Sequence, residues 1–195
     1  MTPPIPAPTR RLVLRGLSLA GVSTGLSACG MLSDITGPKI TIDASRPYKP
    51  VDPERAVATI NAYRAKSGVG PLAHDPKLTA AARTYARHMA EADKMSHALS
   101  PWGPLDKRLR DAGYAYATAG ENLGVGYRDL EDAFEGWRRS PAHDRGMKDP
   151  DMTVMGIASE YRPDSGWKTF WCLMFARPRE AGAPVARGGP FSMGL

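Results

Sequence analysis

The sequence has few of the residues on which the commoner small scaffolds depend. Its 195 residues include only two cysteines, which excludes a disulfide-rich scaffold. No CxxC pair and no GxxxxGK[ST] motif occurs, so zinc ribbons, iron–sulfur clusters and Walker-type nucleotide sites are excluded. The charged and aliphatic residues are too mixed for a disordered protein, and no apolar run reaches the roughly 18 residues of a membrane-spanning helix. What is left is one globular domain with some irregular sequence attached.

The positive charge of the chain is small once its N-terminus is set aside. The formal net charge is +6, and residues 1–28 contribute Arg10, Arg11 and Arg15 but no acid, so the remainder carries +3. No basic run interleaved with aromatic residues occurs. Nucleic acid is therefore not an expected partner, and the charge suits a neutral or weakly anionic one.

Residues 1–28 have the features of an export signal. The pair Arg10-Arg11 precedes an apolar stretch at 16–28 that is too short to span a bilayer, as in a twin-arginine signal peptide. That stretch runs into the letters LSAC at 26–29, which resemble the lipobox of bacterial lipoproteins. We expect cleavage before Cys29 and lipidation of its thiol, which would anchor the protein to a membrane on the periplasmic or extracellular side. Export by the general route remains the alternative to the twin-arginine route.

The folded domain is predicted at 53–179, between two segments of different composition. Residues 29–52 contain Pro38, Pro47 and Pro50 with few large apolar side chains, which predicts an extended tether behind the lipidated cysteine. Residues 180–195 are rich in glycine, alanine and proline and are expected to form a flexible tail. The chain has no internal repeat.

Apolar periodicity predicts four helices followed by a β-hairpin. The helices are expected at 53–66, 76–92, 104–112 and 129–139, and the strands at 152–161 and 167–176, separated by a turn sequence. The second strand is apolar on both faces, including Trp167 and Trp171, so it should lie centrally in a covered sheet. This pattern predicts the α+β class, as a three-layer α-β-α sandwich with a central antiparallel sheet.

Five polar residues are candidates for a functional site, and each is expected in a loop or at a helix end, where binding sites usually form. They are His97, Glu121, Asn122, Ser140 and His143. Two imidazoles and a carboxylate could hold Zn²⁺ or another divalent cation, with water in an open position, although no HExxH motif is present. Alternatively, the carboxylate of Glu121 only fixes the tautomer of a histidine or caps a turn. The serine has no GxSxG elbow, so capping is favoured over a nucleophile–base pair.

Three further residues are given ordinary structural roles. Cys172 lies in the apolar run FWCLMF and is expected to be a buried core thiol. His74 precedes an Asp-Pro helix start, and His88 falls opposite the apolar stripe of its helix, so both are expected to face solvent.

The motifs of the domain, read in order, resemble one known family. They are Asn61-x-x-Arg64-x-x-x-Gly68, Ser96-His97, Arg108-Leu109, Gly120-Glu121-Asn122-Leu123, Trp137-x-x-Ser140-Pro141-x-His143 and Gly156-Ile157-Ala158. In this order the chain resembles the CAP superfamily, which contains the cysteine-rich secretory, antigen 5 and pathogenesis-related 1 proteins and is also called SCP-like. The similarity covers about 53–178 and is to the bacterial branch. It implies the same α-β-α sandwich.

The resemblance also assigns places to the candidate residues. In the family, two histidines and acidic residues line a cleft that binds a divalent cation in some members, and His97, Glu121 and His143 match these positions. Many eukaryotic members have a second glutamate where this chain has Ser140, so a weaker metal affinity is expected here. The superfamily carries many activities, and its fold alone selects none of them.

No residue is a confirmed nucleophile, so the sequence favours a non-enzymatic role. We expect a monomeric, exported, lipid-anchored domain of the bacterial cell envelope whose His/Glu cleft binds a small apolar ligand, an envelope component or a protein partner. The alternative is a metal-assisted hydrolase of peptide or cell-wall material, with Zn²⁺ on His97 and His143 and Glu121 as general base. A third interpretation makes these residues a buried structural hydrogen-bond network.

Overall fold

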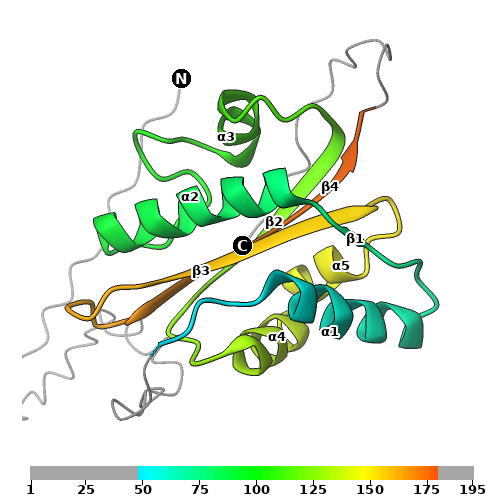
Figure 1. The fold of residues 1–195 in the computed structure, drawn as a ribbon, viewed down its shortest axis with the longest axis horizontal. Coiled ribbons are helices and arrows are strands. Elements are labelled where there is room, and N and C mark those ends of the chain that lie inside the picture. Colours follow the sequence, from blue (N-terminus) through cyan, green and yellow to red (C-terminus); the bar gives the residue numbers. More distant parts are fainter. Residues whose placement is uncertain (1–47, 180–195) are drawn as a thin grey trace, which may run out of the picture. The chain divides into compact units, whose positions relative to one another are not determined.

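The computed structural model describes residues 48–179 (Figure 1). Along the chain, the helices precede the two strands that complete the sheet. The elements are α1 (Pro53–Lys66), β1 (Ala73–His74), α2 (Pro76–Ala92), α3 (Leu105–Asp111), β2 (Tyr116–Val125), α4 (Leu130–Arg139), α5 (Pro141–Met147), β3 (Val154–Tyr161) and β4 (Thr169–Pro178). The predicted signal peptide, Cys29, most of the tether and the C-terminal tail lie outside the described residues. Within the described part, no helix is both long and apolar enough to cross a membrane.

The four strands form one mixed sheet in the order β1-β3-β4-β2. Strands β3 and β4 form the predicted antiparallel hairpin, and β2 pairs antiparallel with the other side of β4. The central strands are antiparallel, as predicted, and the sheet gains a parallel edge that the sequence does not indicate, where β1 pairs with β3 through two residues only. Strand β4 is central and is buried from Thr169 to Ala176, as its apolar sequence predicts.

Helices cover both faces of the sheet and complete three layers (Figure 1). Helices α2 and α3 lie over one face, and α1, α4 and α5 lie over the other. Successive side chains of β4 enter opposite layers because a strand alternates its side chains. The core on the α2 side contains Phe170, Cys172 and Met174, and the core on the α4 side contains Trp171 and Leu173. The α-β-α sandwich is thus built around a strand that both layers share.

Asp-Pro pairs begin the first two helices, as the sequence predicts. The Asp52 carboxylate accepts a hydrogen bond from the Glu54 amide at 3.0 Å, and the Asp75 carboxylate accepts from the amides of Lys77 and Leu78 at 2.8 and 3.1 Å. The following proline occupies the first helical position, where its missing N–H costs nothing. These caps fix the start of α2, the helix that carries the site-bearing loop at its other end.

Helix α2 lies so close to β3 that only glycine fits at position 156. A Cβ atom on Gly156 would lie 2.2 Å from the amide nitrogen of Thr79 and 2.4 Å from the carbonyl carbon of Leu78. Both contacts are with backbone, which cannot move aside as a flexible side chain could. The glycine of the Gly-Ile-Ala motif therefore sets the spacing between the two layers.

A buried arginine ties α1 to the segment that follows α5. The Arg64 guanidinium donates to the carbonyl oxygens of Gly70, Met147 and Asp149 at 2.6, 2.8 and 3.0 Å, and more weakly to that of Met152 at 3.3 Å. Its side chain is 1% exposed. The planar guanidinium group carries several N–H donors and therefore suits these fixed carbonyl oxygens. The helical periodicity of α1 also predicts that Arg64 lies on the buried side of the helix.

Two predictions about exposure are wrong. Trp167 lies in the turn before β4 rather than in the strand, and it is 51% exposed. His74 and His88 are partly buried instead of facing solvent. The ring nitrogens of His74 lie within hydrogen-bond distance of Glu54 and Thr79, while His88 stacks on an indole ring at a centroid distance of 4.0 Å. Long-range partners, which periodicity does not reveal, account for these differences.

Candidate functional site

Glu121 and Asn122 lie within a strand, which corrects the prediction that they belong to a loop. They occupy the middle of β2, opposite Met174 and Leu173 of β4. The glycine-rich run 120–126 suggests a turn in the sequence, but the ladder continues to Val125 and the turn begins only afterwards. β2 is an edge strand, so the site is built along one margin of the sheet.

The two neighbouring residues serve opposite layers of the sandwich. Glu121 alternates with Ala119 and Leu123, which both belong to the core on the α2 side. Asn122 points to the other layer, where its amide nitrogen donates to the backbone carbonyl of His143 in α5 at 3.0 Å. The site therefore has one half on each side of the β2 margin.

The first half is a buried ion pair joined by a histidine. Oε1 of Glu121 accepts a hydrogen bond from Nη2 of Arg108 at 2.7 Å and lies 2.9 Å from Nδ1 of His97. The Glu121 and Arg108 side chains are only 4% and 7% exposed. Arg108 also donates to the carbonyls of Gly103 and His97, and its guanidinium lies 3.4 Å from the centroid of the Tyr85 ring. The guanidinium thus has a carboxylate, two carbonyls and an aromatic face as partners.

This geometry fixes the tautomer of His97. An ionised carboxylate only accepts hydrogen bonds, so Nδ1 of His97 carries a proton. In the neutral ring Nε2 is then the nitrogen that can accept a hydrogen bond or bind a cation. The His97 side chain is 35% exposed, so the ring reaches solvent. The role of Glu121 is the one that the sequence left as an alternative, the orientation of a histidine.

Cys172 completes the surroundings of the carboxylate. Its Sγ lies 3.9 Å from Oε2 of Glu121, and the side chain is buried in the core. Burial, followed by the negative charge of Glu121, raises the pKa of the Cys172 thiol well above its usual value. The prediction of a buried core thiol is confirmed, and a thiol that stays protonated is a poor nucleophile.

The second half of the site begins at a break between two helices. Ser140 ends α4 and also precedes α5, and its side chain makes no capping hydrogen bond. Helical backbone restarts at Pro141, so His143 lies in α5 and not at the end of the preceding helix as predicted. Burial, and to a smaller extent the charge of His97, lowers the pKa of His143 below its ordinary value. His143 is therefore neutral at pH 7.

The donor set for a divalent cation is only partly assembled. The charge of His97 contributes to the lowered pKa of His143, although the two residues are bonded to opposite halves of the site, at Glu121 and Asn122. Glu121, however, is held by Arg108 and His97, so its carboxylate is not offered as a third ligand. Among residues 48–179, no group of three or more histidine, cysteine or acidic side chains is arranged to hold a metal ion. The three-ligand zinc site that the sequence suggests does not fit this arrangement.

Two residues of the site were missed by sequence reasoning. Arg108 appeared only as part of a family motif, yet its position beside Leu109, on the buried side of a short helix, signals a buried partner. Tyr85 appeared only in an apolar stripe. Its hydroxyl donates to the Ser96 carbonyl at 2.5 Å and accepts from the Leu99 amide at 3.2 Å, so it positions the loop that carries His97.

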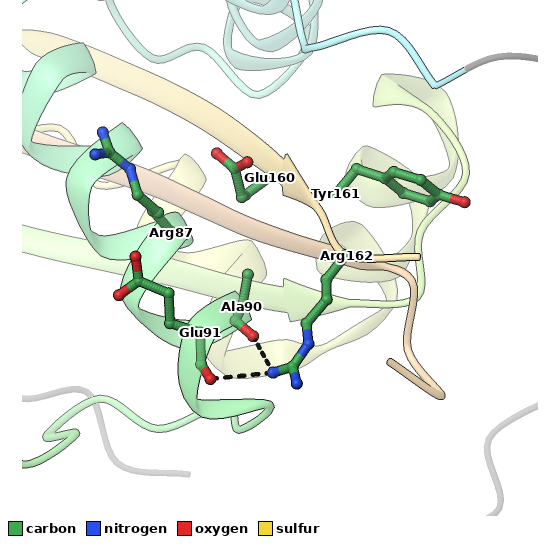
Figure 2. A pocket seen from close by; sticks show the side chains of 6 residues that line it. All are labelled: Arg87, Ala90, Glu91, Glu160, Tyr161 and Arg162. Atoms are coloured by element: carbon green, nitrogen blue, oxygen red, sulfur yellow. Dashed lines mark hydrogen bonds between the residues drawn. The ribbon is translucent and has the colours of Figure 1, made fainter. Parts of the chain in front are cut away.

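A pocket lies elsewhere, at the C-terminal end of α2 (Figure 2). It has a volume of about 240 Å³ and is lined by Arg87, Ala90, Glu91, Glu160, Tyr161 and Arg162. Figure 2 shows Arg162 directed at the end of α2, where it donates to the carbonyls of Ala90 and Glu91 at 2.6 and 3.0 Å. None of the five candidate residues lines this pocket.

Fold and sequence together place the chain in a known class. The sequence matches the family model described as "CAP: Cysteine-rich secretory protein family" over residues 57–175, and the chain belongs to this family. It is 29% identical over 104 residues to the uncharacterized protein YkwD of Bacillus subtilis, covering 53% of this chain and 40% of that protein. It is 31% identical over 97 residues to the uncharacterized membrane protein YlbC of the same organism, covering 50% and 28%. The chain thus spans less than half the length of these curated relatives.

Solved structures support the same fold. An extracellular protein containing an SCP domain from Bacillus anthracis superposes with a TM-score of 0.57 at 22% identity, covering 64% of this chain and 40% of that one. An outer surface protein from Borrelia burgdorferi superposes with a TM-score of 0.59 at 19% identity, covering 67% and 98%. At these identities the likeness shows the fold, and it confirms the predicted α-β-α sandwich.

Proposed function

We propose that this chain is an exported lipoprotein of the bacterial cell envelope whose CAP domain is a non-enzymatic binding module. Two solved relatives are described as an extracellular and an outer surface protein, and one sequence relative as a membrane protein, which supports export. The arginine pair at 10–11 and the lipobox-like letters at 26–29 support lipidation of Cys29. The recognition surface is the pair of imidazoles of His97 and His143.

The observation that carries the non-enzymatic role is the engagement of Glu121. A general base must reach a substrate proton, directly or through one water. The Glu121 carboxylate is 4% exposed, its Oε1 is shared by Arg108 and His97, and its Oε2 faces the Cys172 thiol. It therefore orients His97, and the exposed part of the site consists of imidazole and hydroxyl side chains able to donate and accept hydrogen bonds.

The chemistry of the surface suits an uncharged polar ligand. His143 is neutral at pH 7 because its pKa is lowered, so it does not attract anions by charge. The half-buried hydroxyl of Ser140 lies three residues before it at the start of α5. Imidazole and hydroxyl groups match the hydroxyls and amides of a cell-wall glycan or peptide better than an apolar ligand. We therefore assign a cell-wall component as the ligand class.

Binding to purified cell-wall sacculi, with the released soluble fragments measured in the same tubes, tests this proposal. The chain from Cys29 onward should sediment with the sacculi and release no fragments above a protein-free control. His97→Ala and His143→Ala should each reduce the bound fraction. His74→Ala is the matched control, because it removes a half-buried histidine from the opposite edge of the sheet and should leave binding unchanged.

Hydrolysis would be recognised by a different pattern. Release of soluble fragments that disappears in Glu121→Gln, in a variant that still unfolds cooperatively, would show that the carboxylate is catalytic and would overturn the binding proposal. Equal binding by the native chain and both histidine variants would show that the ligand lies elsewhere.

Lipidation is tested in cells by fractionation. The native chain should be recovered with membranes in a processed form, and Cys29→Ser should be released from membranes or left unprocessed. Cys172→Ser controls for loss of a thiol, since this buried cysteine lies in the core. Membrane recovery that Cys29→Ser leaves unchanged would refute the anchor.

A further inference from the structure

The turn between β3 and β4 holds a tryptophan in solvent. Trp167 is 51% exposed, and Tyr161 at the end of β3 is 37% exposed. Among the residues that the structure describes, these are two of three large apolar side chains with such exposure, the other being Met95. Both lie at one end of the sheet, which Figure 1 shows as the tip of the hairpin. A large aromatic pair at one end of a domain is a candidate contact surface.

The turn is fixed by buried polar contacts. Ser165 is 1% exposed, and its hydroxyl is hydrogen-bonded to the Asp93 carboxylate and accepts from the Trp167 amide at 2.9 Å. The Arg162 amide donates to the Lys168 carbonyl at 2.8 Å, and the Arg162 guanidinium donates to the last carbonyls of α2. Trp167 is thus presented by a turn that is already ordered, so that docking would fix little additional backbone.

The N-terminal segment of the domain enters beside this turn. The Tyr48 ring stacks on Tyr161 at a centroid distance of 5.1 Å and an interplanar angle of 14°. Its hydroxyl is 2.8 Å from Oγ of Ser159, which also accepts from the Val51 amide at 3.1 Å. The first described residue is therefore bound to the same end of the sheet as the exposed aromatic pair.

This attachment places the point where a tether from Cys29 joins the domain at the hairpin end. Eighteen residues lie between Cys29 and Tyr48. A chain of that length reaches at most about 65 Å. Because it joins the domain at the hairpin end, an anchor at Cys29 would keep that end within this distance of the bilayer, at the high effective concentration of an intramolecular contact.

The charges around the turn favour an aromatic contact over an electrostatic one. Lys49, Arg162 and Lys168 supply cations, and Glu160 and Asp164 supply anions, so no strong single-sign field results. Tryptophan and tyrosine prefer the boundary between lipid headgroups and acyl chains, where an apolar ring and a polar atom are both accommodated.

We propose that the β3–β4 turn docks on the phospholipid bilayer that holds the anchor, with the Trp167 and Tyr161 rings at the headgroup boundary. The membrane and the anchor come from the proposed function, but the docking surface is a property of the described domain. Glu121 is four residues from the hairpin end of β2, or about 13 Å along the strand. Docking would therefore hold the His97 and His143 surface near the bilayer.

Quenching of tryptophan fluorescence by brominated lipid tests the docking without relying on lipidation in cells. The chain from Cys29 onward keeps both hydrophobic cores, which lie between Val51 and Ala176. It is coupled through Cys29 to maleimide-bearing vesicles of phosphatidylethanolamine and phosphatidylglycerol, with and without bromine on the acyl chains. On docking, the emission of the native chain should shift to shorter wavelength with both kinds of vesicle and should lose intensity only where the acyl chains carry bromine. Trp167→Phe should abolish most of that loss, because Trp137 and Trp171 are 0% and 1% exposed and Trp102 is partly buried, with its ring stacked on His88.

The matched control moves the reporter to the other end of the sheet. In Trp167→Phe combined with Tyr116→Trp, the indole lies at the start of β2, opposite Pro178, and should not be quenched. Emission of the native chain that bromine leaves unchanged, or equal quenching at both ends, would overturn the docking. Failure of Cys29→Ser to release the protein in cells would refute the anchor and leave this result intact, so the two failures are distinguishable.

Discussion

Breaking the Glu121–Arg108 pair should destabilise the fold far more than breaking an ion pair at the surface. In Glu121→Gln the Arg108 guanidinium, 7% exposed, keeps its carbonyl partners and an amide oxygen but loses the opposite charge. Hydrogen bonds to buried charges contribute about 1.5–3 kcal/mol, so we expect a loss of about 2–3 kcal/mol of unfolding free energy. Arg108→Met leaves the carboxylate buried without its cation and should cost about 3–5 kcal/mol.

A double-mutant cycle isolates the interaction between these two side chains. Urea unfolding followed by tryptophan fluorescence should give a coupling energy of about 2–3 kcal/mol for Arg108→Met with Glu121→Gln, because the second change relieves part of the first. Helix α3 supplies the control pair, Arg110 and Asp106, at the same distance of 2.7 Å but with Arg110 64% exposed. Exposed pairs of this kind couple by about 0.3–0.5 kcal/mol. Equal coupling energies for the two pairs would show that burial does not strengthen the Glu121–Arg108 interaction, and would refute this prediction.

Three further substitutions test features of the fold and the site. Gly156→Ala should cost about 3 kcal/mol, since its Cβ would meet the backbone of α2, whereas Gly70→Ala meets nothing within 4 Å and should be nearly neutral by urea unfolding. Because the folded pKa of His143 lies below the ordinary 6.5, the folded state binds fewer protons, so stability should fall as the pH drops from about 6.5 toward that pKa. His143→Gln should flatten this slope, and NMR titration of the His97→Ala variant should show a higher His143 pKa. Arg64→Lys should lower stability by about 2–3 kcal/mol in thermal unfolding, because an ammonium cannot satisfy the same set of carbonyls; an unchanged midpoint would contradict that role.

The fold was predictable where local and periodic signals agree. Asp52 and Asp75 precede prolines and begin helices where the capping rule places them. The run around Trp171 is apolar on both faces because β4 is covered on both faces. The parallel pairing of β1 was not predictable, since two residues carry no periodicity and their position depends on a strand eighty residues later in the chain.

The site was predictable in its residue types but not in its arrangement. The glycines around Glu121 suggest a turn, yet they permit close approach within a strand, as at Gly124, where a Cβ would lie 2.3 Å from the Tyr127 ring. The contact of Arg108 with Glu121 joins a helix to a strand, and no spacing rule relates such residues. The local sequence therefore identified His97 and His143 as site residues, but it could not show that the Glu121 carboxylate pairs with Arg108.

The alternation of Glu121 and Asn122 along β2 has a consequence for how the site can change in evolution. Each half is supported by a different layer, one through Arg108 and α3, the other through His143 and α5. Substitutions in one layer can therefore alter one half while the other keeps its contacts. A shift of β2 by a single residue, by contrast, would exchange the two side chains between layers and dismantle both halves at once. Ligand preference can thus drift gradually through the helices, whereas the register of β2 against β4 at Glu121 and Asn122 must stay fixed.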